Sequence, residues 1–109
     1  MLSDRKNGCL ITVSTRAGVP IVMMPENNSA MVFSTLVYSL IGFAMNEDKQ
    51  RKILLYRIKD RKLMVRIGKR SFVAIYVPEI YEDRARSFIE ESREIIRKVD
   101  DLVVEEGVI

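Results

Sequence analysis

The spacing of apolar residues first indicates two short strands. The runs Cys9–Thr15 and Val19–Met24 are apolar and rich in β-branched residues, and only a few residues separate them. Two such runs around a short glycine-containing link predict a β-hairpin, with Gly18 at the positive φ that the turn needs. Pro20 has no N–H to donate to a ladder, so we expect the second strand to begin at a sheet edge.

A long apolar segment follows the loop 25–29 and predicts a helix over residues 30–50. Its first half is apolar around most of its circumference, whereas a helix that covers a sheet needs only an apolar stripe. We therefore expect one face to contact a second copy or another partner, although burial within its own chain is the alternative. The predicted interface combines small or polar positions with two larger neighbours: Thr35, Tyr38, Ser39, Gly42 and Met45.

The second half of the chain predicts three strands and a final helix. The strands cover residues 53–58, 63–67 and 72–77, and short polar tips join them as antiparallel hairpins. Pro78 suits the first turn of the helix that follows. Its apolar stripe is predicted at Tyr81, Ala85, Phe88, Ser92, Ile95, Val99 and Leu102, and Ile89, Ile96 and Val103 widen it. The order ββ-α-βββ-α predicts an α+β fold with a five-stranded, mainly antiparallel sheet, as a single domain over 1–109 with its ordered core at about 8–104.

Composition narrows the setting and the chemistry. The 109 residues suit one domain, and a single cysteine excludes an internal disulfide framework and favours the cytoplasm. The apolar segment 30–45 is short for a bilayer and contains Ser34 and Ser39, so we interpret it as a buried helix and expect no membrane span. The absence of histidine removes the commonest general base and most zinc sites. No nucleophile has an identifiable base, so we expect no enzyme activity, no cofactor and no metal.

Charge is distributed unevenly along the chain. Residues 49–70 contain ten lysines and arginines and one acid, whereas residues 79–109 contain ten acids and five bases. The basic segment predicts a surface for nucleic acid, an anionic membrane or an acidic partner, although solvated hairpin tips and protected edge strands are the alternative. Its candidate partner-binding residues are Arg57, Lys59, Arg61, Lys62, Arg66, Lys69 and Arg70.

The segment Gly8–Val22, with its apolar strand, glycine-containing turn and proline-containing strand, resembles the opening of roadblock/dynein light chain domains. The order of elements also matches that family and its longin and profilin-like relatives. Roadblock domains usually carry a further helix before the first strand, so the chain resembles a variant shortened at the N-terminus, of a prokaryotic kind.

The resemblance implies a homodimer or heterodimer whose sheets join edge to edge and whose middle helices pack together. It also implies a non-catalytic scaffold or regulator of small Ras-like GTPases, or a subunit of a larger assembly. The alternative function is a small nucleic-acid-binding protein that uses the basic hairpins at 49–70. A sensor domain with a small ligand is a third possibility, without a polar signature in the sequence.

Overall fold

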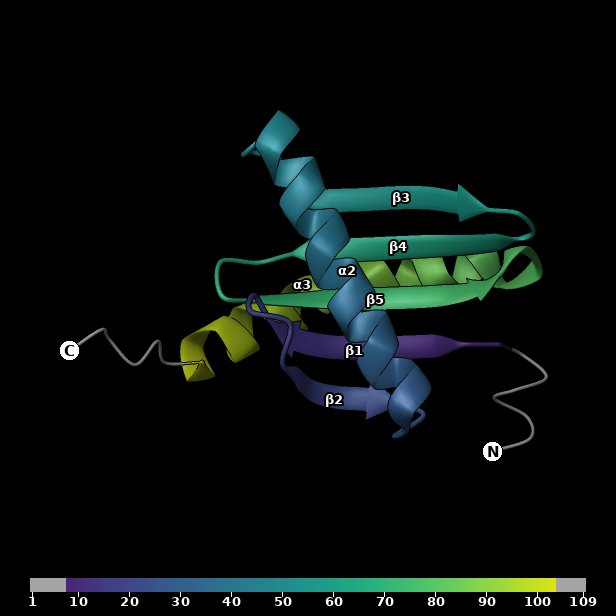
Figure 1. Ribbon diagram of the computed structural model, residues 1–109, viewed down its shortest axis with the longest axis horizontal. Helices are drawn as coiled ribbons and strands as arrows, with labels where there is room; N and C mark the ends of the chain where they lie inside the picture. The colour runs from purple at the N-terminus through teal and green to yellow at the C-terminus, as the bar shows by residue number, and fades with distance from the viewer. Residues whose placement is uncertain (1–7, 104–109) are drawn as a thin grey trace.

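The computed structural model describes residues 8–103, which form one sheet with a helix on each face (Figure 1). The strands are β1 (Leu10–Thr15), β2 (Pro20–Met24), β3 (Ile53–Ile58), β4 (Arg61–Ile67) and β5 (Ser71–Pro78). The helices are α2 (Asn28–Glu47) and α3 (Glu82–Leu102), and a short 3-10 turn at Glu79–Tyr81 precedes α3. The predicted element order and fold class are confirmed.

All strand pairs are antiparallel, in the spatial order β2-β1-β5-β4-β3. The long connection through α2 therefore places β3 at the edge far from β2, with β5 in the centre. Gly18 has φ +88° in the β1–β2 turn, as predicted, and Pro20 begins the edge strand β2. The register between β1 and β2 shifts between Val13 and Ser14, which marks a β-bulge beside this proline.

Apolar side chains point to both faces of the sheet and form two apolar cores, one on each face. Under α2 the buried side chains include Phe33 and Val37 of the helix and Leu54, Val65 and Phe72 of the strands. Under α3 they include Ala85, Ile89 and Ile96 of the helix with Met64, Val73, Ile75 and Val77 of the strands. Because consecutive side chains of a strand point to opposite faces, β4 and β5 serve both cores and are buried along most of their length.

A buried chain of hydroxyl groups ties α2 to β1. Thr12 Oγ1 lies 2.7 Å from Ser14 Oγ, which lies 2.7 Å from Ser34 Oγ on α2. The Ser34 hydroxyl also donates to the carbonyl of Gly18 in the β1–β2 turn, at 3.1 Å. All three hydroxyl-bearing residues are fully buried. These bonds fix which face of α2 meets the sheet, because turning the helix would leave buried hydroxyls without partners.

The predicted end of the middle helix, the predicted role of Pro78 and part of the predicted stripe of the last helix are wrong. The middle helix ends at Glu47 rather than residue 50, because the Asp48 side chain accepts from the amide of Gln50 and turns the backbone out of the helix. Pro78 ends β5 instead of opening a helix. In α3 the buried stripe is narrower than predicted: Ile89 and Ile96 are buried as expected, whereas Ile95 and Leu102 are exposed.

The predicted shortening before the first strand concerns residues 1–7, which lie outside the described residues. The predicted core limit at about residue 104 also falls just beyond them.

Candidate functional site

The outer face of α2 is apolar and exposed. No charged residue occurs from Asn27 to Asn46, so this face carries no charge along about five turns. Five large apolar side chains on it have exposed fractions between 46% and 73%: Met31, Val32, Leu36, Tyr38 and Phe43. Together they expose apolar surface on the order of several hundred Å², the size of the largest patch on an ordinary monomer, which is often a functional surface.

The small and polar residues predicted for the interface form the middle of this face. Thr35, Ser39 and Gly42 are all exposed, and a Cβ placed on Gly42 would meet no atom within 4 Å. The hydroxyls of Thr35 and Ser39 donate to carbonyls of their own helix, of Met31 and Thr35, at 3.2 and 3.4 Å. Because these donors are already satisfied, the strip is less polar than its sequence suggests and suits close approach of another helix.

Tyr38 and Met45 lie at the borders of the predicted interface. The ring of Tyr38 packs beside the β1–β2 turn, since a Cβ on Gly18 would come within 3.2 Å of it. Met45 is half-buried, and its sulfur accepts a hydrogen bond from Arg16 at 3.0 Å, so it faces the end of the sheet. The structure therefore groups Thr35, Ser39 and Gly42 with Tyr38 and places Met45 to one side.

The edge strand β3 adds a second candidate surface, which sequence reasoning did not single out. Its apolar side chains Ile53, Leu55 and Ile58 are exposed, and Arg57 is its one charged residue. The opposite edge, β2, is protected by a proline and a bulge, whereas β3 pairs in regular register with β4 along all six residues. An apolar run without proline was the available signal, but only the strand order shows that this run lies at an edge.

The predicted basic surface is split between the two ends of the sheet. Arg57, Lys59, Arg61 and Lys62 lie at the β3–β4 hairpin tip, and Arg66, Lys69 and Arg70 lie at or near the β4–β5 turn. The seven residues of β4 separate these ends by roughly 20 Å at about 3.3 Å per residue. Alternating turns of an antiparallel sheet lie at opposite ends, so one dense segment of sequence supplies two separate surfaces.

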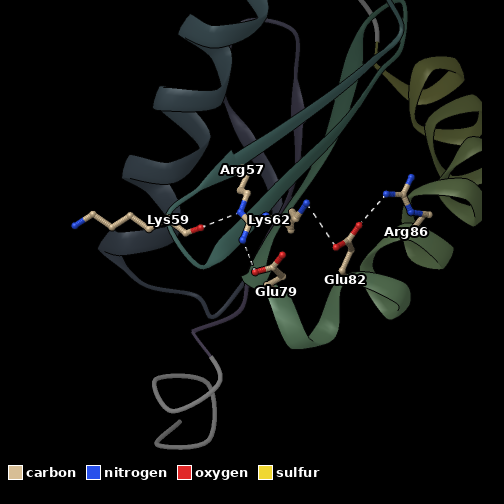
Figure 2. Close-up of polar contacts among 6 residues, drawn as sticks. All are labelled: Arg57, Lys59, Lys62, Glu79, Glu82 and Arg86. Carbon is tan, nitrogen blue, oxygen red and sulfur yellow. Dashed lines mark hydrogen bonds and ion pairs between the residues drawn. The ribbon is translucent and has the colours of Figure 1, made fainter.

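At the hairpin tip, acidic residues at the start of α3 and in the turn before it neutralise much of the positive charge (Figure 2). Arg57 pairs with Glu79 at 2.9 Å, and Glu82 lies 3.6 Å from Lys62 and 3.0 Å from Arg86. The hydrogen bond from Arg86 is the main cause that lowers the pKa of Glu82 below its usual value. Desolvation is the next largest effect and opposes it, and the charge of Lys62 lowers the pKa further. These contacts make the tip a poor electrostatic match for a polyanion.

Other residues of the predicted basic surface bind groups of their own chain close to where they lie. Arg61 lies over the ring of Tyr76, 5.4 Å from its centroid, and donates to the carbonyl of Gly8 at 2.9 Å. Arg70 donates to the carbonyls of Asp100 and Val103, the last acceptors of α3, at 3.3 and 3.1 Å. Lys59 occupies the tip with φ +57°.

Two further features of the described residues bear on their chemistry. By length and composition α2 is long and apolar enough to cross a membrane. However, its inner face packs on the sheet and bonds to β1, as expected of a buried helix, whereas its outer face is exposed. Between residues 8 and 103, no three His, Cys, Asp or Glu side chains are grouped so that they could hold a metal ion.

Comparison with known proteins supports the fold through structure alone. No family model matches the sequence, and no curated protein matches it. Among solved structures, Myxococcus xanthus MglB has a TM-score of 0.72 at 14% identity, covering 96% of this chain and 86% of that chain. A Roadblock/LC7 domain from Streptomyces avermitilis has a TM-score of 0.63 at 10% identity, covering 81% and 84% respectively. A structure described as MglB with tetrameric arrangement scores 0.60 at 15% identity, covering 89% and 84%. The chain therefore has a roadblock-like fold.

Proposed function

We propose that this protein is a cytoplasmic, non-catalytic scaffold or regulator that dimerises and binds a small Ras-like GTPase or a larger protein assembly. The observation that carries the proposal is the charge-free, exposed outer face of α2, which has no role in the fold of a single chain. The roadblock-like fold supports it, because the resemblance of the sequence to roadblock domains implies such a role.

The occupant proposed for the outer face of α2 is a second copy of the chain. Two such faces are self-complementary: both are apolar and uncharged, and both have small residues along the middle, where Gly42 leaves open space. A two-fold axis would bring the same patch of each copy together, as in most homodimers. The same axis could join two β3 edges in antiparallel fashion and continue the sheet.

The proposed dimer leaves other surfaces for a partner, including α3 and the end of the sheet at the β4–β5 turn. One structural neighbour is described in a tetrameric arrangement. For this chain we propose a dimer as the basic unit, on which a GTPase or the subunits of an assembly dock.

Nucleic-acid binding is the less supported function. This function was predicted from one continuous basic surface over residues 49–70. The strand order divides those residues between the two ends of the sheet. Contacts with Glu79 and Glu82 offset much of the charge at the hairpin tip.

Affinity capture from native lysate, with and without nuclease, tests the proposed partner. We expect a small GTPase or a defined set of subunits to be retained after nuclease treatment. The variant Leu36→Glu, which places a charge on the outer face of α2, should capture less if the partner recognises the dimer. Ile80→Glu is the matched control, since Ile80 is 83% exposed in the turn before α3. Recovery of ribosomal or chromatin proteins that disappear with nuclease would contradict the proposal.

A further inference from the structure

A basic cavity of about 640 Å³ lies at the end of the sheet opposite the hairpin tip. Eight lysines and arginines and two aspartates line it. They come from segments far apart in sequence: Arg16 follows β1, Lys49, Arg51 and Lys52 lie between α2 and β3, and Arg93 lies on α3. The fold thus concentrates positive charge in a hollow that no short segment of the sequence forms by itself.

Most of these cations have no acidic partner. Arg97 pairs with Glu94 at 2.7 Å, and among residues 8–103 none of the other seven has a carboxylate within 4.0 Å. One of the two aspartates is already engaged: Asp100 accepts from the amides of Lys69 and Arg70 at 3.0 Å and from the Ser71 hydroxyl at 2.7 Å. The hairpin tip in Figure 2 shows the opposite arrangement, with glutamates beside its cations.

Arg66 sits in the wall of the cavity and is held in place. Its Nε donates to the carbonyl of Ile89 on α3 at 2.9 Å, and its side chain is half-buried. Burial and the nearby charge of Arg93 lower the pKa of Arg66 from its usual value, although Glu90 opposes the effect. Two positive charges thus lie close together in a partly desolvated place. A bound anion would reduce the repulsion between them.

The shape and the lining indicate the class of anion. The volume is that of a small-molecule site, and the side chains of Met45, Ile67 and Ile96 contribute apolar wall. No aromatic residue lines the cavity, so it lacks the stacking platforms on which single-stranded nucleic acid binds. Guanidinium and ammonium groups that several segments contribute to one cavity suit adjacent phosphate groups, which arginine can bind in a bidentate manner.

We propose that this cavity binds a small anion with two or more adjacent phosphate groups, of the pyrophosphate or nucleoside polyphosphate class. The proposal does not depend on dimerisation or on a GTPase partner. Gly68 contributes to the site by allowing α3 to lie against the β4–β5 turn, since a Cβ there would come within 2.4 Å of Ile96.

Calorimetric titration of the full chain with inorganic pyrophosphate tests the proposal, with inorganic phosphate and ATP as the other ligands. We expect pyrophosphate to bind at least about tenfold more tightly than phosphate, because it engages more of the cations. Equal affinities for ATP and pyrophosphate would assign the binding to the phosphates alone. Tighter binding of ATP would assign the site to a nucleotide.

Two triple variants with the same change in net charge locate the site. Lys49→Gln, Arg51→Gln and Lys52→Gln together should weaken pyrophosphate binding at least about tenfold. Arg57→Gln, Lys59→Gln and Arg86→Gln together, at the other end of the sheet, should change it less than about twofold. All six side chains are exposed, so both variants should fold, which circular dichroism checks.

Three results would overturn the proposal. The first is no binding of pyrophosphate or ATP at about 1 mM ligand. The second is an equal loss in both triple variants, since that would indicate a general effect of net charge. The third is tighter binding of a single-stranded oligonucleotide than of ATP with an equal loss in both variants, since that would indicate a nucleic-acid surface.

Discussion

The two helices cover opposite faces of one sheet and have nearly the same length, 20 residues in α2 and 21 in α3. More than half of the residues of α3 are charged, and its outer side is solvated, with ion pairs such as Glu82–Arg86 and Glu94–Arg97. The outer side of α2 has no charge before Glu47 and exposes large apolar groups. Since α3 shows how little apolar surface a covering helix needs, the second apolar face of α2 indicates a contact outside the chain.

Two phenylalanines on α2 should separate its inner face from its outer face most strongly. Phe33 is 7% exposed and packs in the core, whereas Phe43 is 73% exposed to solvent. Phe33→Ala should lower the free energy of unfolding by about 3–5 kcal/mol through lost burial and a cavity. Phe43→Ala should change it by less than about 0.5 kcal/mol when the chain is monomeric. Urea denaturation at low protein concentration measures both, and similar losses would contradict the assignment of the two faces.

Two serines on the same helix provide a polar version of this test. Ser34→Ala should cost about 1–2 kcal/mol of stability, because it removes one partner of the Ser14 hydroxyl and the donor to the Gly18 carbonyl. Ser39→Ala should be neutral or slightly stabilising, because alanine has the higher helix propensity and the lost bond is an exposed one within the helix. Thermal unfolding of the two variants compares them directly, and the reverse order would show that the buried hydroxyl chain does not fix α2.

The two edge strands extend the comparison to the sheet. Leu55→Lys on β3 should weaken the proposed dimer about tenfold, because a buried charge and lost apolar area oppose edge pairing. Val22→Lys on β2 is the matched control, since the two side chains are 53% and 52% exposed, and it should leave self-association unchanged. Sedimentation equilibrium gives the two dissociation constants. A larger effect of Val22→Lys would indicate that the two copies pair through β2 and not through β3.

The smallest expected effect concerns the charged start of α3. The folded pKa of Glu82 lies below its usual value of 4.5, so the ionised side chain adds stability that is fully present above that value and is lost as pH falls through the folded pKa. Glu82→Gln lacks this contribution, so wild type and variant should converge as pH falls from about 5.5 to about 3. Arg86→Gln should also make the stability of the chain depend less on pH, because it removes the main cause of the lowered pKa of Glu82. A stability gap that widens towards low pH would have the wrong sign.

Local patterns in the sequence predict much of the fold. The apolar runs, the turn at Gly18 and the proline of β2 were sufficient for the strands and their order along the chain. The excess apolar surface of α2 indicated the outer face. Boundaries were less predictable, because the end of α2 depends on a single hydrogen bond that the Asp48 side chain accepts from the Gln50 amide. The width of the buried stripe of α3 depends on which of its isoleucines the sheet can bury.

The candidate surfaces depend on contacts between distant segments, and these were only partly predictable. The density of charge over residues 49–70 suggested one basic surface, although the antiparallel order places its two turns at opposite ends. The cavity combines Arg16, Arg66 and Arg93 from three elements, and no spacing along the chain brings them together. The edge position of β3 likewise follows only from the strand order.

Sedimentation velocity over a range of micromolar concentrations tests the central claim most directly, with the wild type beside Leu36→Glu and Ile80→Glu. The account predicts that wild type and Ile80→Glu sediment as dimers and that Leu36→Glu sediments as a folded monomer, because a charge desolvated between two α2 faces is unfavourable. A wild-type chain that stays monomeric throughout, or a Leu36→Glu variant that dimerises as tightly as wild type, would contradict the claim that the outer face of α2 is an interface.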